Sequence, residues 1–151
     1  MAESSPSDGS PDRPFEGDSP GPRTLEERAL LGIFVHLIAV PTGIIGAGTI
    51  YVIANHEFTV ENARHALNWH LGITLLLVVS VGAFGIVAIQ EEFGVVIFPD
   101  VIDVLFFLIA FVGIFVLSIA WFLTFLFSII AMVKAIFGTA WKYPVVPEFI
   151  K

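Results

Sequence analysis

Three long stretches of the chain contain no aspartate, glutamate, lysine or arginine: Ala29–Ala54, His65–Gln90 and Val104–Val133. Each exceeds the roughly 20 residues that an α-helix needs to cross the hydrocarbon core of a bilayer. Only 14% of the 151 residues are charged, whereas a soluble domain carries about 25%. Because a bilayer offers no water to backbone groups, such runs must satisfy their hydrogen bonds as helices. The sequence therefore predicts an all-α integral membrane bundle with three long apolar segments.

The first apolar run is broken in its middle by Pro41-Thr42-Gly43. Proline removes a backbone donor, and glycine weakens a helix. The halves Ala29–Val40 and Thr42–Ala54 would each be about 18–20 Å long as helices, too short for a core of ~30 Å. The run is therefore either one kinked span or a re-entrant pair of short helices, which gives three or four membrane helices.

The remaining parts of the chain are expected to be tails and connectors. Residues 1–22 are rich in serine, proline, glycine and acidic side chains, so we expect a disordered acidic tail there and a membrane-embedded domain over 23–151. Thr24-Leu25-Glu26-Glu27 is typical of a helix start. Thr59 is the expected N-cap of the second helix, and Gln90–Asp103 is expected to be an acidic loop.

The seven basic residues predict how the chain lies in the membrane. Three precede the first run, Arg64 lies in the first connector, three follow the third run, and the Gln90–Asp103 loop has none. Basic residues prefer the cytoplasmic side. Three simple spans would divide them almost evenly, whereas a re-entrant first run places all of them on one side. We therefore favour a hairpin-like first run in the plasma membrane, with both termini cytoplasmic.

Polar side chains that could form a site gather in Glu61–His70 and after the third run. On a helix, Arg64 and Asn68 share one face, while His65 and Trp69 share another. We expect the two stretches to touch, with Arg64 or Asn68 bonding to carbonyls at the Gly138 helix end. The candidate residues are Arg64, His65, Asn68, Trp69, Lys134, Gly138, Trp141, Tyr143 and Pro144.

This set is interpreted as a structural latch, in which Trp141 or Tyr143 packs against Trp69 or His65. A binding surface for a lipid headgroup or a peptide is the alternative. His36 lies inside the first run, and we expect it to be a polar residue at a helix contact, although a histidine within a membrane helix is also a candidate functional residue.

The stretches Asn62-Ala63-Arg64-His65-Ala66-Leu67-Asn68-Trp69 and Lys134–Pro144 together carry a family resemblance. They resemble a prokaryotic membrane family of unknown function that is distantly related to the Tic-twenty component of the chloroplast inner-envelope protein import machinery. In that family an Ala-Leu-Asn-aromatic stretch opens a membrane helix, and a Lys-Ala, Gly, aromatic and Tyr-Pro series closes the last one. The resemblance covers about residues 25–151 and implies a compact helical bundle with a broken first run and no established activity.

No pattern typical of an enzyme or of a bound cofactor is present. The chain has no cysteine, no nucleophile elbow, no phosphate-binding glycine loop and no His-Glu-x-x-His motif. Its four histidines lack the spacing of zinc ligands, and no basic patch suggests nucleic acid. We therefore predict neither metal nor cofactor, and no catalysis.

The predicted function is that of a small multi-pass scaffold or accessory subunit of a membrane assembly, including one related to protein translocation. Its partners would be the lipid bilayer and either another membrane protein or further copies of the same chain. The alternative is a small-solute channel or transporter acting as an oligomer, because discontinuous helices frame many transport sites.

Overall fold

The computed structural model describes residues 29–151, which form three α-helices: α1 (Leu30–Ile53), α2 (Glu57–Phe93) and α3 (Asp100–Ile136). All three are long and apolar enough to cross a membrane by length and composition. The prediction of an all-α membrane bundle is therefore confirmed. The tail expected over 1–22 and the helix start expected at Thr24 lie outside the described residues.

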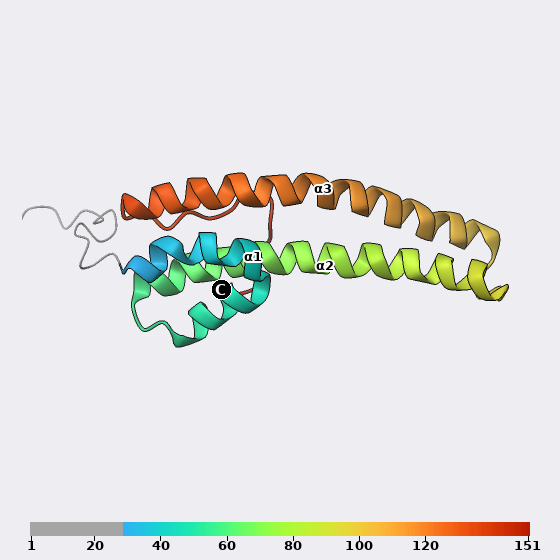
Figure 1. Ribbon diagram of the computed structural model, residues 1–151, viewed down its shortest axis with the longest axis horizontal. Coiled ribbons are helices and arrows are strands. Elements are labelled where there is room, and N and C mark those ends of the chain that lie inside the picture. The colour runs from blue at the N-terminus through green and yellow to red at the C-terminus, as the bar shows by residue number, and fades with distance from the viewer. Residues whose placement is uncertain (1–28) are drawn as a thin grey trace, which may run out of the picture.

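Helix α1 folds back on itself at Gly43, whose backbone has φ 58° and ψ −135°. The second half of α1 returns toward the start of the first half (Figure 1). Nothing lies within 4 Å of the position that a Cβ would occupy on Gly43, so glycine is required there for its backbone conformation rather than for space. The halves are about 20 Å and 15 Å long, so the first run has the doubled-back shape of the expected hairpin and not that of one kinked span.

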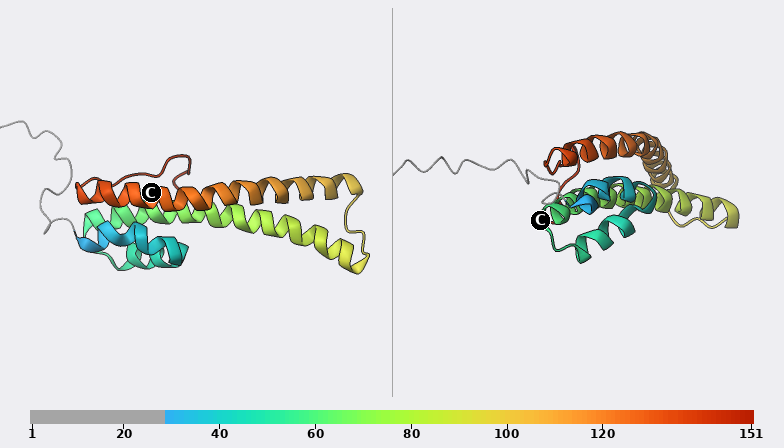
Figure 2. Two further views of the ribbon diagram at one scale, coloured as in Figure 1. Left: turned by 45° about the horizontal axis from the view of Figure 1, so that its top comes forward. Right: turned by 60° about the vertical axis from the view of Figure 1, so that its left-hand side comes forward.

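Helices α2 and α3 run antiparallel beside each other, as the views in Figures 1 and 2 show. Each has 37 residues, which is about 55 Å of helix. They approach closely at Gly113, where an added Cβ would overlap the Ser80 hydroxyl. Such contact between small residues is a common basis of helix association in membranes.

Two helix boundaries differ from the prediction. Thr59 is not the N-cap of α2, because the helix starts at Glu57 after His56. The expected loop Gln90–Asp103 is shorter, since α2 continues to Phe93 and α3 starts at Asp100. The charged residues that end an apolar run remain helical here, and α2 stops only at Gly94, which has a left-handed φ of 61°.

The two ends of the bundle differ in width. We call the end that contains α1, the start of α2 and the end of α3 the hairpin end, and the end that contains Gln90–Asp103 the acidic end. After α3, the C-terminal segment 137–151 folds back over the helices (Figure 1). The core of the hairpin end is rich in fully buried alanines, which let the helices approach closely: Ala39, Ala47, Ala63, Ala66 and Ala131.

Candidate functional site

A chain of hydrogen bonds lies in the buried centre of the hairpin end. His36 Nε2 is 2.9 Å from Asn62 Oδ1, and His36 Nδ1 is 3.1 Å from the Tyr143 hydroxyl. The Asn62 amide nitrogen donates to the Phe58 carbonyl at 2.8 Å, which orients Oδ1 toward His36. Since a carbonyl oxygen only accepts, Nε2 must carry the proton, and the Tyr143 hydroxyl donates to the bare Nδ1. The neutral imidazole thus uses both of its nitrogens.

These bonds join three separate parts of the chain: α1, α2 and the C-terminal segment. His36 is fully buried, and a buried polar group without a partner is costly. Tyr143 is also buried, and burial raises the pKa of its hydroxyl to about 12. His36 therefore lies at a helix contact, where Asn62 and Tyr143 balance the cost of burying it.

Aromatic rings also pack around Tyr143. Tyr143 stacks on Trp69 with ring centroids 5.4 Å apart and planes 18° apart. Phe127 packs edge-on against both rings, and Trp141 packs against Phe127 and Tyr143. The Trp69 indole donates to the Thr124 hydroxyl at 2.9 Å. The structure thus brings Trp69, Trp141 and Tyr143 together in one cluster.

Asn68 holds the far end of the C-terminal segment. Its amide nitrogen donates to the Ile150 carbonyl at 3.0 Å, and its Oδ1 accepts from the Ile150 N–H at 2.8 Å. One side chain thereby satisfies both backbone groups of a residue that lies in no helix. The prediction gave Arg64 or Asn68 as the partner of carbonyls at the Gly138 helix end, and the structure places Asn68 on Ile150 instead.

The end of α3 is closed by its own backbone. The Thr139 N–H donates to the Lys134 carbonyl at 3.0 Å, and Gly138 has a left-handed φ of 83°. Arg64 lies 3.5 Å from Glu61, one turn away on the same helix, and the His65 ring lies 3.8 Å from the same carboxylate. The Val133, Lys134 and Ala135 carbonyls at this helix end thus accept from backbone N–H groups of residues 137–139.

The other candidate residues lie on the surface. Lys134 and Pro144 are exposed. Lys142 forms an exposed ion pair with Glu148 at 2.8 Å, and its hydrogen bond holds the pKa of that carboxyl below the usual value. Exposed pairs of this kind contribute little to stability.

The acidic end contains a residue that sequence reasoning missed. Gln90 Oε1 accepts hydrogen bonds from the N–H groups of Ile97 and Phe98 at 2.7 Å and 3.0 Å. Its amide nitrogen donates to Asp103 at 2.6 Å. The available signal was a lone amide side chain at the end of a charge-free run. Gln90 therefore ties α2, the connector and α3 together.

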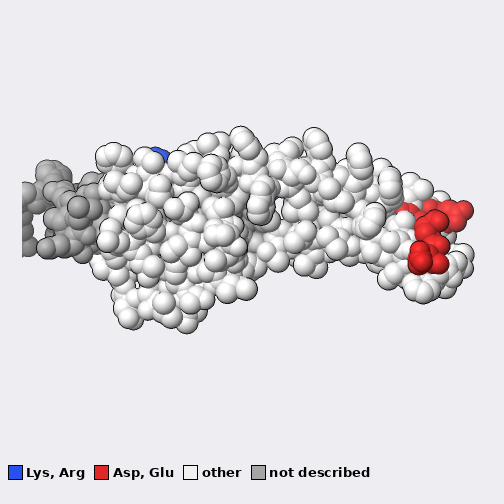
Figure 3. Space-filling model, in the orientation of Figure 1, with Lys and Arg blue, Asp and Glu red and all other residues white. Residues whose placement is uncertain are grey.

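Four carboxylates lie around this connector: Glu91, Glu92, Asp100 and Asp103. Figure 3 shows acidic side chains gathered at this end of the molecule. The sequence contains no lysine or arginine from His65 to Val133, so no basic side chain of this part of the chain offsets them. Within residues 29–151, no group of three or more histidine, aspartate or glutamate side chains is arranged to hold a metal ion.

The profile of the magnetosome magnetite crystal formation protein family (MamF/MmsF) matches residues 27–150. The chain belongs to this family. The match includes all three helices, the hairpin end and the acidic end. The chain matches no curated protein and no solved structure. It is thus a membrane protein of a magnetosome family that is concerned with magnetite crystals.

The MamF/MmsF match corrects the resemblance to Tic-twenty-related proteins, which is wrong. The two stretches that carried it have general structural uses in this fold. Asn68 satisfies backbone groups, Gly138 ends a helix, and Trp69 and Tyr143 stack. Any small membrane bundle can need these features, so they do not identify a family. The translocation role loses its basis with the resemblance, and the matched family is a magnetosome membrane family.

Proposed function

We propose that this chain is a non-enzymatic accessory protein of the magnetosome membrane, and that it acts on magnetite growth through its acidic end. Membership of the MamF/MmsF family supports the process and the membrane. The observation that carries the role is the segregation of charge: four carboxylates lie at one end of the helices, far along the chain from any basic residue.

The acidic end acts as a field rather than as a chelating site. Within residues 29–151 its carboxylates form no metal-binding cluster, so they attract cations collectively. Carboxylate oxygens suit hard cations, and a surface of one charge raises the local concentration of oppositely charged ions. Iron cations, or the cationic surface of a growing iron oxide, are the partners that this chemistry fits.

Gln90 supports this role because it fixes the connector that carries the charges. Its hydrogen bonds to Ile97, Phe98 and Asp103 hold the second half of the connector and the start of α3 against α2. Glu91, Glu92 and Asp100 remain exposed around it. Carboxylates held in fixed positions lose less entropy on meeting a mineral surface than carboxylates on a loose loop.

The same proposal gives an orientation. The basic residues Arg64, Lys134 and Lys142 lie at the hairpin end, and basic residues favour the cytoplasmic side. The acidic end then faces the interior of the compartment in which the crystal grows. At the hairpin end, the bonds made by His36 and Asn68 act as a structural latch that keeps the C-terminal segment in place.

A charge-matched pair of variants tests the proposal in a magnetosome-forming bacterium that lacks the native gene. The test variant is Glu91→Gln, Glu92→Gln, Asp100→Asn, which keeps Asp103 and its bond to Gln90. The control is the triple variant Glu57→Gln, Glu61→Gln, Glu148→Gln. It removes three negative charges from the start of α2 and from the C-terminal segment. The readout is the crystal size distribution by electron microscopy, with the amount of protein in purified magnetosome membranes measured by immunoblotting.

We expect the control to restore the crystals of the wild type and the test variant to resemble the strain without the gene. Equal amounts of the two variants in the magnetosome membranes would show that the change in the crystals does not come from degradation of the protein. If the test variant restores normal crystals at normal protein levels, the acidic end has no role in mineral growth.

A further inference from the structure

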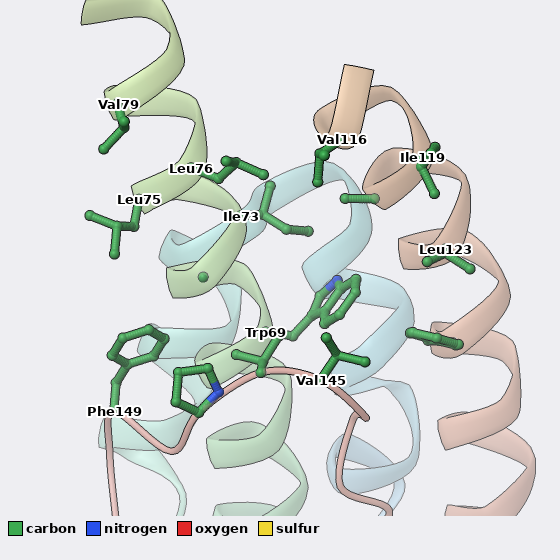
Figure 4. Close-up of a pocket in the computed structure, with 15 residues that line it drawn as sticks. Trp69, Ile73, Leu75, Leu76, Val79, Val116, Ile119, Leu123, Val145 and Phe149 are labelled. Carbon is green, nitrogen blue, oxygen red and sulfur yellow. The ribbon is translucent and has the colours of Figure 1, made fainter. Parts of the chain in front are cut away.

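An apolar groove of about 520 Å³ lies between α2, α3 and the C-terminal segment. This volume is in the range of small-molecule sites in proteins, about 300–1,000 Å³. In Figure 4, Ile73 and Leu76 of α2 face Val116 and Ile119 of α3 across the groove, while Val145 and Phe149 lie at its edge. All the side chains named here are hydrocarbon, so the groove is built for an apolar occupant.

The polar atom in the wall of this groove is already used. The Trp69 indole N–H donates to Thr124 at 2.9 Å. An occupant therefore finds apolar side chains and no polar side chain that lacks a partner. The side chains of the wall therefore favour an apolar ligand, because a polar solute would lose hydration that they do not replace.

The groove opens onto the outer face of the membrane-spanning helices. Leu75, Val79 and Ile119 line the groove, and each is also about half exposed on the outside. All three lie within the long apolar parts of α2 and α3. The bilayer around these helices consists of acyl chains, so the groove is continuous with the surface that acyl chains cover.

The C-terminal segment forms the roof of the groove and lacks an apolar cover of its own. Val145 is 97% exposed and has a φ of 75°, a conformation that is unusual for a β-branched residue. Irregular backbone at membrane depth needs protection from lipid or contact with protein. Strained, uncovered residues beside a groove are typical of places where a ligand completes the structure.

We propose that the groove holds one acyl chain of a bilayer phospholipid, inserted between α2 and α3 beneath the C-terminal segment. A groove of about 520 Å³ has room for only about one turn of a helix that is about 10–12 Å across, so a single extended chain of methylenes fits it better than a helix of a second copy. The bound chain packs against Ile73 and Leu76 and covers Val145. The phospholipid thereby becomes part of the hairpin end and holds the C-terminal segment against the helices.

A substitution that fills the groove tests the proposal, with a matched substitution outside it. Ala120 lines the groove, whereas Ala88 is exposed on α2 away from it, so the pair is Ala120→Phe and Ala88→Phe. The full chain is purified from membranes in a mild detergent and measured by native mass spectrometry. We expect the wild type and Ala88→Phe to retain a phospholipid mass, and Ala120→Phe to lose it.

A second measurement locates the acyl chain and does not depend on detergent. Trp121→Phe with Trp141→Phe leaves Trp69 as the sole tryptophan, and Trp69 is 5% exposed. In vesicles of phospholipid brominated in mid-chain, we expect quenching of Trp69 fluorescence that Ala120→Phe removes and Ala88→Phe preserves. Absence of quenching in the parent protein would overturn the proposal, as would equal phospholipid retention by the two phenylalanine variants or a second copy retained in place of lipid.

Discussion

Replacing Asn68 by leucine is expected to release the C-terminal segment while the helices remain folded. Asn68 is only 5% exposed and makes two hydrogen bonds to the backbone of Ile150, at 3.0 Å and 2.8 Å. Each such bond contributes about 0.5–1.5 kcal/mol net. Leucine makes neither bond and is a good helix former. The substitution should therefore weaken the docking of the C-terminal segment and leave the stability of α2 unchanged.

The expected cost is the sum of the two bonds, about 1–3 kcal/mol. A central value of ~2 kcal/mol corresponds to roughly a 30-fold change in the opening equilibrium, since 1.4 kcal/mol is tenfold. Amide hydrogen exchange reports such local opening directly. The Ile150 amide, whose acceptor is the Asn68 side chain, should therefore exchange about 30-fold faster in Asn68→Leu.

The control is Asn55→Leu, the same chemical change at an exposed position in the connector before α2. We expect it to leave exchange at Ile150 unchanged. Amides in the middle of α2 should keep their protection in both variants. If Ile150 exchanges at the wild-type rate in Asn68→Leu, or equally fast in both variants, Asn68 does not hold the segment.

Two further predictions concern the buried hydrogen bonds of His36. His36→Leu removes the partner of Asn62 Oδ1 and of the Tyr143 hydroxyl. The free energy of unfolding in detergent should therefore fall by about 2–4 kcal/mol. The exposed His56→Leu serves as the control and should lower it by only about 0.5 kcal/mol. A loss as small as that of the control would refute the hydrogen-bond assignment. Burial raises the pKa of Tyr143 to about 12, so its contribution to stability is complete below the ordinary tyrosine value of about 10 and is lost as pH rises through 12. Ultraviolet difference spectra should show a tyrosine titrating at about pH 12 that Tyr143→Phe removes; titration of that tyrosine near pH 10 would contradict its burial.

The membrane helices and the hairpin could be predicted from the sequence because each depends on local chemistry. The charge-free runs give the helices, since no other structure satisfies the backbone in lipid. Pro41 and Gly43 mark the turn in α1, and the distribution of the basic residues favoured the re-entrant form. These signals lie within a few neighbouring residues or consist of the number of basic residues in each connector. They can therefore be interpreted without knowledge of tertiary contacts.

The side-chain partners could not be predicted in the same way. His36 was recognised as a buried polar residue, but its acceptor and donor lie 26 and 107 residues away. Asn68 was placed correctly near the C-terminal segment but at the wrong residue, because a carbonyl bonded by its own helix looks the same in the sequence as an unbonded one. Gln90 was missed because an amide at a helix end is usually solvated.

The re-entrant shape of α1 has a consequence for the bilayer itself. In the orientation proposed above, its two short helices fall in one leaflet, and α2 and α3 alone continue through the other. Copies inserted in the same direction therefore take up more area in one leaflet than in the other. A bilayer relieves such an imbalance by bending, with the crowded leaflet on the convex side. The carboxylates of Glu91, Glu92 and Asp100 then lie on the concave side, so the shape of the molecule favours a small closed vesicle with these charges facing its interior.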